Sequence, residues 1–186
     1  MSAASETHGR LATRPVVPAA VLGMALLLFT EVMFFGGLIS SYLVLRTRTV
    51  LWPPIGQSRL PEWLAAANTV VLLASGLLAW KSARVSGPTA RRLSSLSIAL
   101  GACFVSLQVF EGVRLVAHGV TMSSSVFGSV FYALVGGHAL HAVCGLALYV
   151  WAVHTRVGVH TMTAARMYWY FVVTLWPVLW ALVYLW

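Results

Sequence analysis

Apolar residues fill five long stretches of the chain, and short polar segments separate them. Each stretch is close to or longer than the roughly 20 residues that an α-helix needs to cross a bilayer. Proline, glycine and serine mark the polar segments, as at Trp52-Pro53-Pro54 and Ser86-Gly87-Pro88, which is typical of turns. The pattern predicts an all-α integral membrane protein. It has an amino-terminal segment over residues 1–17 and one domain over 18–186, with transmembrane helices over about 18–45, 63–80, 93–116, 126–153 and 168–186.

Composition supports this fold class. The 186 residues are 60% hydrophobic and 9% charged, whereas a soluble domain typically carries about 25% charged residues. The formal net charge is +8, which in a soluble protein would favour a nucleic-acid partner. Here the basic residues lie in the short polar segments, where anionic headgroups and membrane topology account for them. We therefore expect membrane lipids, and no nucleic acid, as partners.

The distribution of lysine and arginine predicts the orientation of the chain. Eight of these residues lie in the amino-terminal segment and in the second and fourth gaps between helices, and four lie in or beside the first and third gaps. An excess of basic residues marks the cytoplasmic side of a membrane. We therefore predict a cytoplasmic amino terminus and an external carboxyl terminus.

One acidic residue, Glu31, lies in the middle of the first apolar stretch. A carboxyl group at that depth costs on the order of 3 kcal/mol on insertion scales, so its presence indicates a partner, a water-filled path or a proton that requires it. Removal from water favours the neutral form of a carboxyl group. We predict that Glu31 is largely protonated at neutral pH and is bonded to a neighbouring helix or faces lipid. It is an intramembrane functional candidate.

Two histidines, His138 and His141, lie three residues apart in the fourth apolar stretch. At this spacing they project to nearby positions on one helix face. Histidine inside a membrane helix can bind a metal or haem, relay protons, or form a hydrogen bond to another helix. The pair alone leaves these roles open, and both residues are intramembrane functional candidates.

Glu111 and Arg114 are also three residues apart, near the end of the third stretch. Residues at this spacing share a helix face and can pair. We predict a structural ion pair at the headgroup boundary or a lipid contact.

The sequence argues against a redox centre held by this chain alone. The two axial ligands of a bis-histidine haem normally come from different helices, and the four remaining histidines lie in or beside polar segments. Glu31 is the only carboxylate predicted at mid-membrane depth, which disfavours a di-metal site. Cys103 and Cys144 are far apart and have no metal-ligand spacing. We therefore expect no metal-binding or cofactor-binding residue in this chain.

Small residues four apart recur in the apolar stretches: Gly36 with Ser40, Gly37 with Ser41, and Ser97 with Gly101. Lipid provides little hydrophobic drive between helices, so small faces that allow close backbone approach favour their association. We predict that these faces pack against neighbouring helices.

The motifs along the chain form an ordered set. The first stretch contains Thr30-Glu31-Val32-Met33-Phe34-Phe35-Gly36-Gly37-Leu38 and continues with Ser41-Tyr42-Leu43-Val44-Leu45-Arg46. Later motifs are Trp52-Pro53-Pro54, Asn68-Thr69, Phe110-Glu111, the run 121–132, Gly137-His138-Ala139-Leu140-His141 and Tyr168-Trp169. In order and spacing, this set resembles the short bacterial form of subunit III of cytochrome c oxidase. The similarity spans almost the whole chain from about Pro18.

The resemblance implies a place in a larger complex. Members of this family flank the catalytic subunit of a haem-copper oxidase, which carries the haem and copper, reduces dioxygen and pumps protons in aerobic respiration. They carry no redox centre themselves and, in bacteria, lie in the cell inner membrane. They hold phospholipid in a V-shaped cleft between two helical bundles, support proton uptake, and protect the catalytic centre during turnover. Glu31 matches the family's carbodiimide-reactive glutamate. His138, His141, Glu111 and Arg114 match positions that in this family lie around lipid contacts and helix junctions.

One stretch departs from the family pattern. The family commonly has a histidine where Tyr170 stands and an aspartate where Val173 stands, so the last helix lacks two polar groups of typical members. This indicates a divergent branch.

Three alternatives follow from the same residues. A related accessory subunit of a nitric oxide reductase has a similar five-helix pattern. An independent proton-coupled transporter would use Glu31 and His141 as relay groups, but five helices cannot form two equal inverted repeats. A haem-bearing quinone-site anchor is disfavoured because opposed histidines are missing.

Overall fold

The computed structural model describes residues 17–48, 62–117 and 126–185. Predictions that fall on residues 1–16, on Trp52-Pro53-Pro54, on residues 121–125 of the run 121–132 and on Trp186 lie outside the described residues. The chain forms six α-helices and two π-helical turns within the described ranges. In order they are α1 (Ala19–Arg48), α2 (Glu62–Ser82), α3 (Gly87–Ala117), α4 (Val126–Phe131), η1 (Tyr132–Gly136), α5 (Gly137–His154), α6 (Val159–Trp180) and η2 (Ala181–Leu185).

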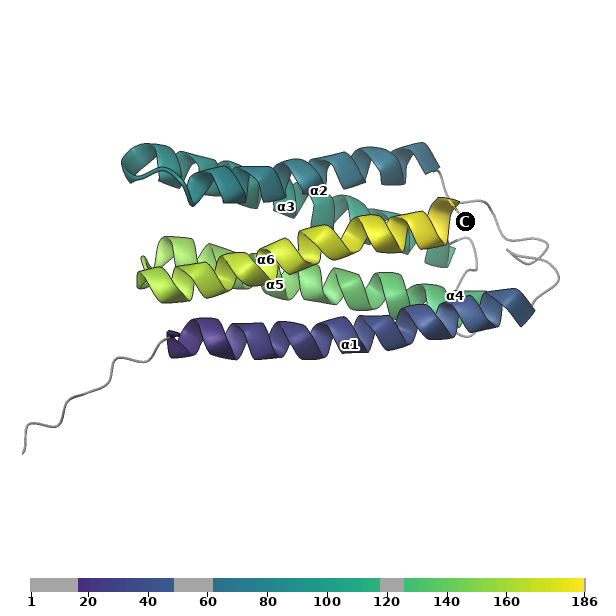
Figure 1. The fold of residues 1–186 in the computed structure, drawn as a ribbon. Coiled ribbons are helices and arrows are strands. Elements are labelled where there is room, and N and C mark those ends of the chain that lie inside the picture. Colours follow the sequence, from purple (N-terminus) through teal and green to yellow (C-terminus); the bar gives the residue numbers. More distant parts are fainter. Residues whose placement is uncertain (1–16, 49–61, 118–125, 186) are drawn as a thin grey trace, which may run out of the picture.

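These elements form five membrane-spanning helices within the described part of the chain. Helices α4 and α5 join through η1 into the fourth span, and α6 continues into η2 in the fifth. Successive spans run in opposite directions, so the start of α1, the α2–α3 turn and the α5–α6 turn lie at one end of the molecule (Figure 1). The predicted all-α membrane fold with five transmembrane helices is confirmed. The two bundles and their V-shaped cleft stay a prediction.

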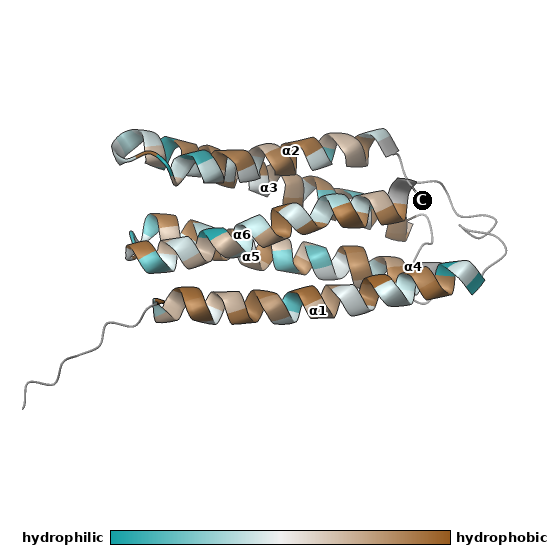
Figure 2. Ribbon diagram, in the orientation of Figure 1, coloured by the Kyte–Doolittle hydropathy of each residue, from teal (hydrophilic) through white to brown (hydrophobic). Residues whose placement is uncertain are grey.

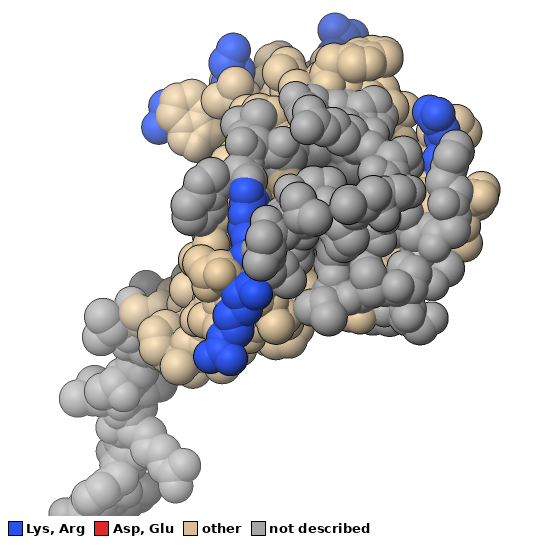
Figure 3. Space-filling view, turned by 90° about the vertical axis from the view of Figure 1, so that its right-hand side faces the viewer, with Lys and Arg blue, Asp and Glu red and all other residues tan. Residues whose placement is uncertain are grey.

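Basic side chains lie at both ends of the molecule. The end where α1 and α3 finish carries Arg46, Arg48 and Arg114, and Figure 3 shows basic side chains but no described acidic side chain in view there. The other described lysine and arginine residues lie toward the opposite end: Lys81, Arg84, Arg91, Arg92, Arg156 and Arg166. This asymmetry supports the predicted orientation, which itself stays a prediction.

Two helices begin earlier than the hydropathy pattern predicted. Helix α3 begins at Gly87 and not near residue 93, and α6 begins at Val159 and not near residue 168. Hydropathy marks only the part of a helix that lies in hydrocarbon, and both helices continue into polar sequence. Pro88 lies in the first turn of α3, where an N–H has no partner within the helix. Gly87 has a φ of 71°, a left-handed conformation that glycine adopts without strain.

Helix α6 lies at the centre of the bundle, against α1, α2 and α5. Glycines on its neighbours make room for its aromatic side chains. A Cβ atom at Gly101 of α3 would lie 2.7 Å from Trp169 Cζ2, and one at Gly145 of α5 would lie 2.8 Å from Tyr168 Cδ1. Trp169 is fully buried as a result. The aromatic rings of α6 therefore pack directly on the backbone of α3 and α5 at these glycines, and this packing stabilises the position of α6 in the bundle.

Side-chain hydrogen bonds join α2, α3 and α6 inside this apolar interior. Ser75 Oγ and Ser97 Oγ each donate to the other residue's carbonyl oxygen at 2.8 Å. Trp169 Nε1 donates to Ser75 Oγ at 3.1 Å, and Trp176 Nε1 donates to Thr69 Oγ1 at 2.9 Å. Such bonds between membrane helices average about 0.6 kcal/mol each. They fix the register of the three helices more than they add to stability.

The small-residue faces divide into two groups. Ser97 and Gly101 pack against α2 and α6, as predicted. At Gly36 and Gly37 of α1, by contrast, a Cβ atom would meet nothing within 4 Å. No described helix of this chain therefore provides the neighbour that we predicted for this face of α1.

Enlarging Gly101 to alanine is expected to destabilise the chain by about 1–3 kcal/mol, because the added methyl group forces the Trp169 ring or α6 to move. The same change at Gly36 should be neutral, or stabilising by up to about 1 kcal/mol, because alanine favours a helix more than glycine does. Unfolding of the two purified variants in mixed detergent micelles measures both effects. Equal effects at the two positions would contradict the packing described above.

Candidate functional site

Glu31 and His141 meet between α1 and α5, near the middle of α1. His141 Nε2 lies 2.9 Å from Glu31 Oε2, and the side chains of Glu31 and His141 are 20% and 16% exposed. Figure 2 shows hydrophilic bands partway along α1 and α5, within largely hydrophobic ribbons. The structure thus brings together two residues that the sequence marked separately. The contact matches the predicted bond of Glu31 to a neighbouring helix, and the functional roles of both residues stay predictions.

The hydrogen bonds of His141 fix the number of protons in this pair. Its Nδ1 lies 2.7 Å from the carbonyl oxygen of Gly137, which can only accept, so Nδ1 carries a proton and donates it. The Nε2–Oε2 contact then contains one further proton. Either neutral His141 accepts it from protonated Glu31, or charged His141 donates it to the carboxylate. Both arrangements give the pair a net charge of zero, which suits a hydrocarbon environment.

Aromatic side chains surround the ring of His141. Phe35 lies edge-on at a centroid distance of 5.1 Å, and Phe34 stacks at 6.2 Å. Phe35 is only 1% exposed and also contacts Phe171 of α6. Helix α1 therefore binds the bundle through apolar contacts around the polar pair, and these contacts limit the access of water to it.

His138 has a different environment from His141, although we predicted that the two share a face. It is fully buried, its ring stacks on Trp176 at a centroid distance of 5.0 Å, and Phe104 lies edge-on to it at 6.2 Å. Neither ring nitrogen has a hydrogen-bond partner among the described residues. Residues three apart differ by about 60° around a helix with 3.6 residues per turn. That difference points His138 toward α3 and α6, whereas His141 points toward α1.

Glu111 lies inside the bundle, at 5% exposure, and lines a cavity of about 150 Å³ between α3 and the α4–η1–α5 span. Gln108 lines the same cavity, and its Oε1 accepts a hydrogen bond from Asn68 Nδ2 at 3.3 Å. Arg114 is exposed, with its guanidinium carbon 5.9 Å from the ring centroid of Phe110. The ion pair or lipid contact of Glu111 and Arg114 stays a prediction.

Two features of the helices that carry the site are not evident in the sequence. The π-helical turn η1 directly precedes α5, which carries both histidines, and such turns are frequent at functional sites. The adjacent glycines at 136 and 137 were its only sequence signal. In addition, Tyr42 Oη donates to the Leu182 carbonyl at 3.0 Å, and Arg46 Nη1 donates to Tyr42 Oη at 3.2 Å. These bonds join the end of α1 to η2.

No group of three or more His, Cys, Asp or Glu side chains among the described residues is arranged to bind a metal ion. Cys103 and Cys144 are free thiols on the outside of the bundle. The expectation that this chain binds no metal or cofactor stays a prediction.

Comparison with known proteins identifies the family. The family described as cytochrome c oxidase subunit III matches residues 1–186. The chain belongs to the cytochrome c oxidase subunit III family. It is 33% identical over 179 residues to cytochrome c oxidase subunit 3 of Thermostichus vulcanus, covering 89% of this chain and 86% of that protein. It is 37% identical over 177 residues to the probable cytochrome c oxidase subunit 3 of Nocardia farcinica, covering 88% and 86%.

Family membership confirms the resemblance that the motifs indicated. As a subunit III of cytochrome c oxidase, the chain is a subunit of a haem-copper oxidase complex, and other oxidase subunits are its partners. Its five apolar helices make it a multi-pass membrane protein.

Proposed function

We propose that the chain is the non-redox subunit that flanks the catalytic subunit of a bacterial haem-copper oxidase. In this role it binds phospholipid, supports proton uptake and protects the catalytic centre during dioxygen reduction. It lies in the inner membrane with its amino terminus in the cytoplasm, and the haem and copper belong to its partners. Membership of the subunit III family supports this role.

The exposure of α1 carries the proposal. Only 6% of the most apolar 18-residue window of α1 is buried within the chain, compared with 28–39% for the other four spans. The open space at Gly36 and Gly37 lies on this helix, and small residues allow another membrane helix to approach closely. Helix α1, which also carries Glu31, thus has a bare face at Gly36 and Gly37. A helix of the catalytic subunit can pack against this face.

We infer that the Glu31–His141 pair retains its proton and supports the oxidase without conducting protons itself. It keeps one shared proton at mid-membrane depth without net charge. Gain or loss of that proton would leave a charge among Phe34, Phe35 and lipid, which is unfavourable. The pair therefore acts as a local proton-holding site beside the catalytic subunit, and not as a step in a pore through this chain.

Co-purification tests the proposed function. A tag on this chain, with extraction in mild detergent, is expected to recover a haem-copper catalytic subunit with oxidase activity. Gly37→Leu should reduce that recovery severalfold because the added side chain fills the bare face of α1. Gly112→Leu in α3 is the matched control, since its Cβ position is also open, and it should leave recovery unchanged. Recovery of the chain alone would contradict the proposal, and recovery of a nitric oxide reductase would favour that alternative.

A further inference from the structure

A groove of about 470 Å³ runs between α2 and α6. Its lining is almost entirely apolar: Leu73, Gly76, Leu77, Trp80, Tyr170, Val173 and Thr174. Thr174 Oγ1 donates to the Tyr170 carbonyl at 2.8 Å, so its hydroxyl group is already bonded within α6. The two positions that depart from the family pattern, 170 and 173, thus both lie in this groove.

The shape of the groove follows from its smallest residue. A Cβ atom at Gly76 would lie 2.7 Å from Val173 Cγ1, so α2 and α6 approach closely there and form the floor of the groove. The flanking side chains of α2 remain open to the outside, with Leu73 at 40%, Leu77 at 60% and Trp80 at 43% exposure. At this depth the surroundings are hydrocarbon, so an apolar chain is the ligand that this part of the groove suits.

Two arginines lie at one end of the groove. The Arg84 guanidinium carbon lies 3.3 Å from the ring centroid of Trp80, and Arg166 Nη2 donates to Ser82 Oγ at 3.4 Å. Tyr170, which lines the groove, follows Arg166 by about one turn of α6. Among the described residues, Arg166 Nε has no hydrogen-bond partner and neither arginine pairs with a carboxylate. This end of the groove therefore presents two cationic side chains.

We propose that this groove binds an anionic phospholipid, with one acyl chain between α2 and α6 and the phosphate between Arg84 and Arg166. The two arginines at the end of the helices can contact the phosphate, and the apolar lining of the groove can contact the acyl chain. Anionic lipids are concentrated in the cytoplasmic leaflet, where this end lies in the predicted orientation. The inference deepens the lipid-binding part of the proposed function and rests on it for the membrane setting.

The test uses the tagged oxidase complex after partial delipidation, with native mass spectrometry to count retained phosphatidylglycerol and phosphatidylcholine. The double variant Arg84→Gln/Arg166→Gln is expected to retain about tenfold less phosphatidylglycerol, because each basic residue near the headgroup strengthens its binding. Thr174→Phe should reduce retention by filling the groove, with both arginines intact. Recovery of the catalytic subunit should stay unchanged in both variants, so a failure of this inference is distinct from a failure of the proposed function.

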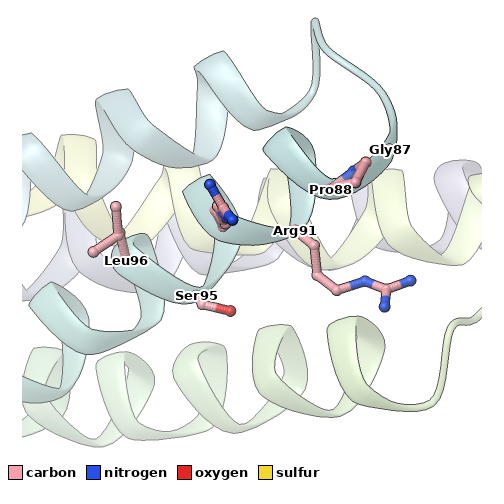
Figure 4. Close-up of a pocket in the computed structure, with 6 residues that line it drawn as sticks. Gly87, Pro88, Arg91, Ser95 and Leu96 are labelled. Atoms are coloured by element: carbon pink, nitrogen blue, oxygen red, sulfur yellow. The ribbon is translucent and has the colours of Figure 1, made fainter.

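The matched control is Arg91→Gln/Arg92→Gln. These arginines lie at the start of α3, toward the same end of the molecule, in a pocket with Gly87, Pro88, Ser95 and Leu96 (Figure 4). Unchanged phosphatidylglycerol retention in this control supports the proposal. Equal losses of phosphatidylglycerol in the two double variants would overturn it. So would retention of phosphatidylcholine equal to that of phosphatidylglycerol in the unmodified complex. Binding of inorganic phosphate in place of lipid, or a partner helix in the groove, would also overturn it.

Discussion

Replacing Trp169 with alanine is expected to destabilise the chain by about 3–5 kcal/mol, the usual cost of removing a buried tryptophan side chain. Trp169 is fully buried at the centre of the bundle. Its ring fills the space that Gly101 leaves, and its indole N–H bonds to Ser75. The substitution therefore leaves a cavity where α2, α3 and α6 meet. Detergent-titrated unfolding, followed by tryptophan fluorescence and circular dichroism, measures the loss.

Trp63→Ala is the matched control for this substitution. Trp63 lies at the start of α2 and is 74% exposed, so the same chemical change creates no cavity and should shift stability by less than about 0.5 kcal/mol. Similar losses at Trp63 and Trp169 would show that α6 is not the packed centre of the bundle.

Replacing Glu31 with leucine is expected to loosen α1 from the rest of the chain by about 1–3 kcal/mol, because His141 Nε2 loses its partner inside a largely apolar contact. Glu31→Gln should preserve this docking. A glutamine side chain can both donate to and accept from the ring nitrogen, but it has no acidic proton. Cross-linking of cysteines placed in α1 and α5, compared across the variants, measures the docking.

The same two variants separate docking from proton chemistry. Reaction with a hydrophobic carbodiimide should be lost in both, since each lacks the carboxyl group, whereas docking should be lost only in Glu31→Leu. A double-mutant cycle with His141→Leu should give a coupling energy of about 1 kcal/mol between the two sites. Additive effects of the single changes would mean that the 2.9 Å contact adds nothing to the docking of α1.

The five spans could be predicted because a bilayer imposes a length and a hydropathy that the sequence shows directly. Helix ends were less predictable. The first turns of α3 and α6, which begin at Gly87 and Val159, are helical but polar. Hydropathy therefore does not reveal them, and they are recognised only by their backbone hydrogen bonds.

The candidate site was predictable in its members but not in its arrangement. Glu31 and His141 stood out because polar groups in hydrocarbon are costly, yet their pairing depends on how α1 packs against α5, which no local pattern encodes. The separate environments of His138 and His141 depend on small differences in angle around α5. For the same reason, the sequence could not distinguish the buried Gly101 from the open Gly36, because both have the spacing typical of helix packing.

The decisive measurement is a cryo-electron microscopy map of the complex purified through a tag on this chain. We predict a haem-copper subunit beside the exposed face of α1, with the Glu31–His141 contact intact and without water between the two side chains. A map with Glu31, His138 and His141 along an open aqueous pore, away from any oxygen-reducing subunit, would contradict this prediction.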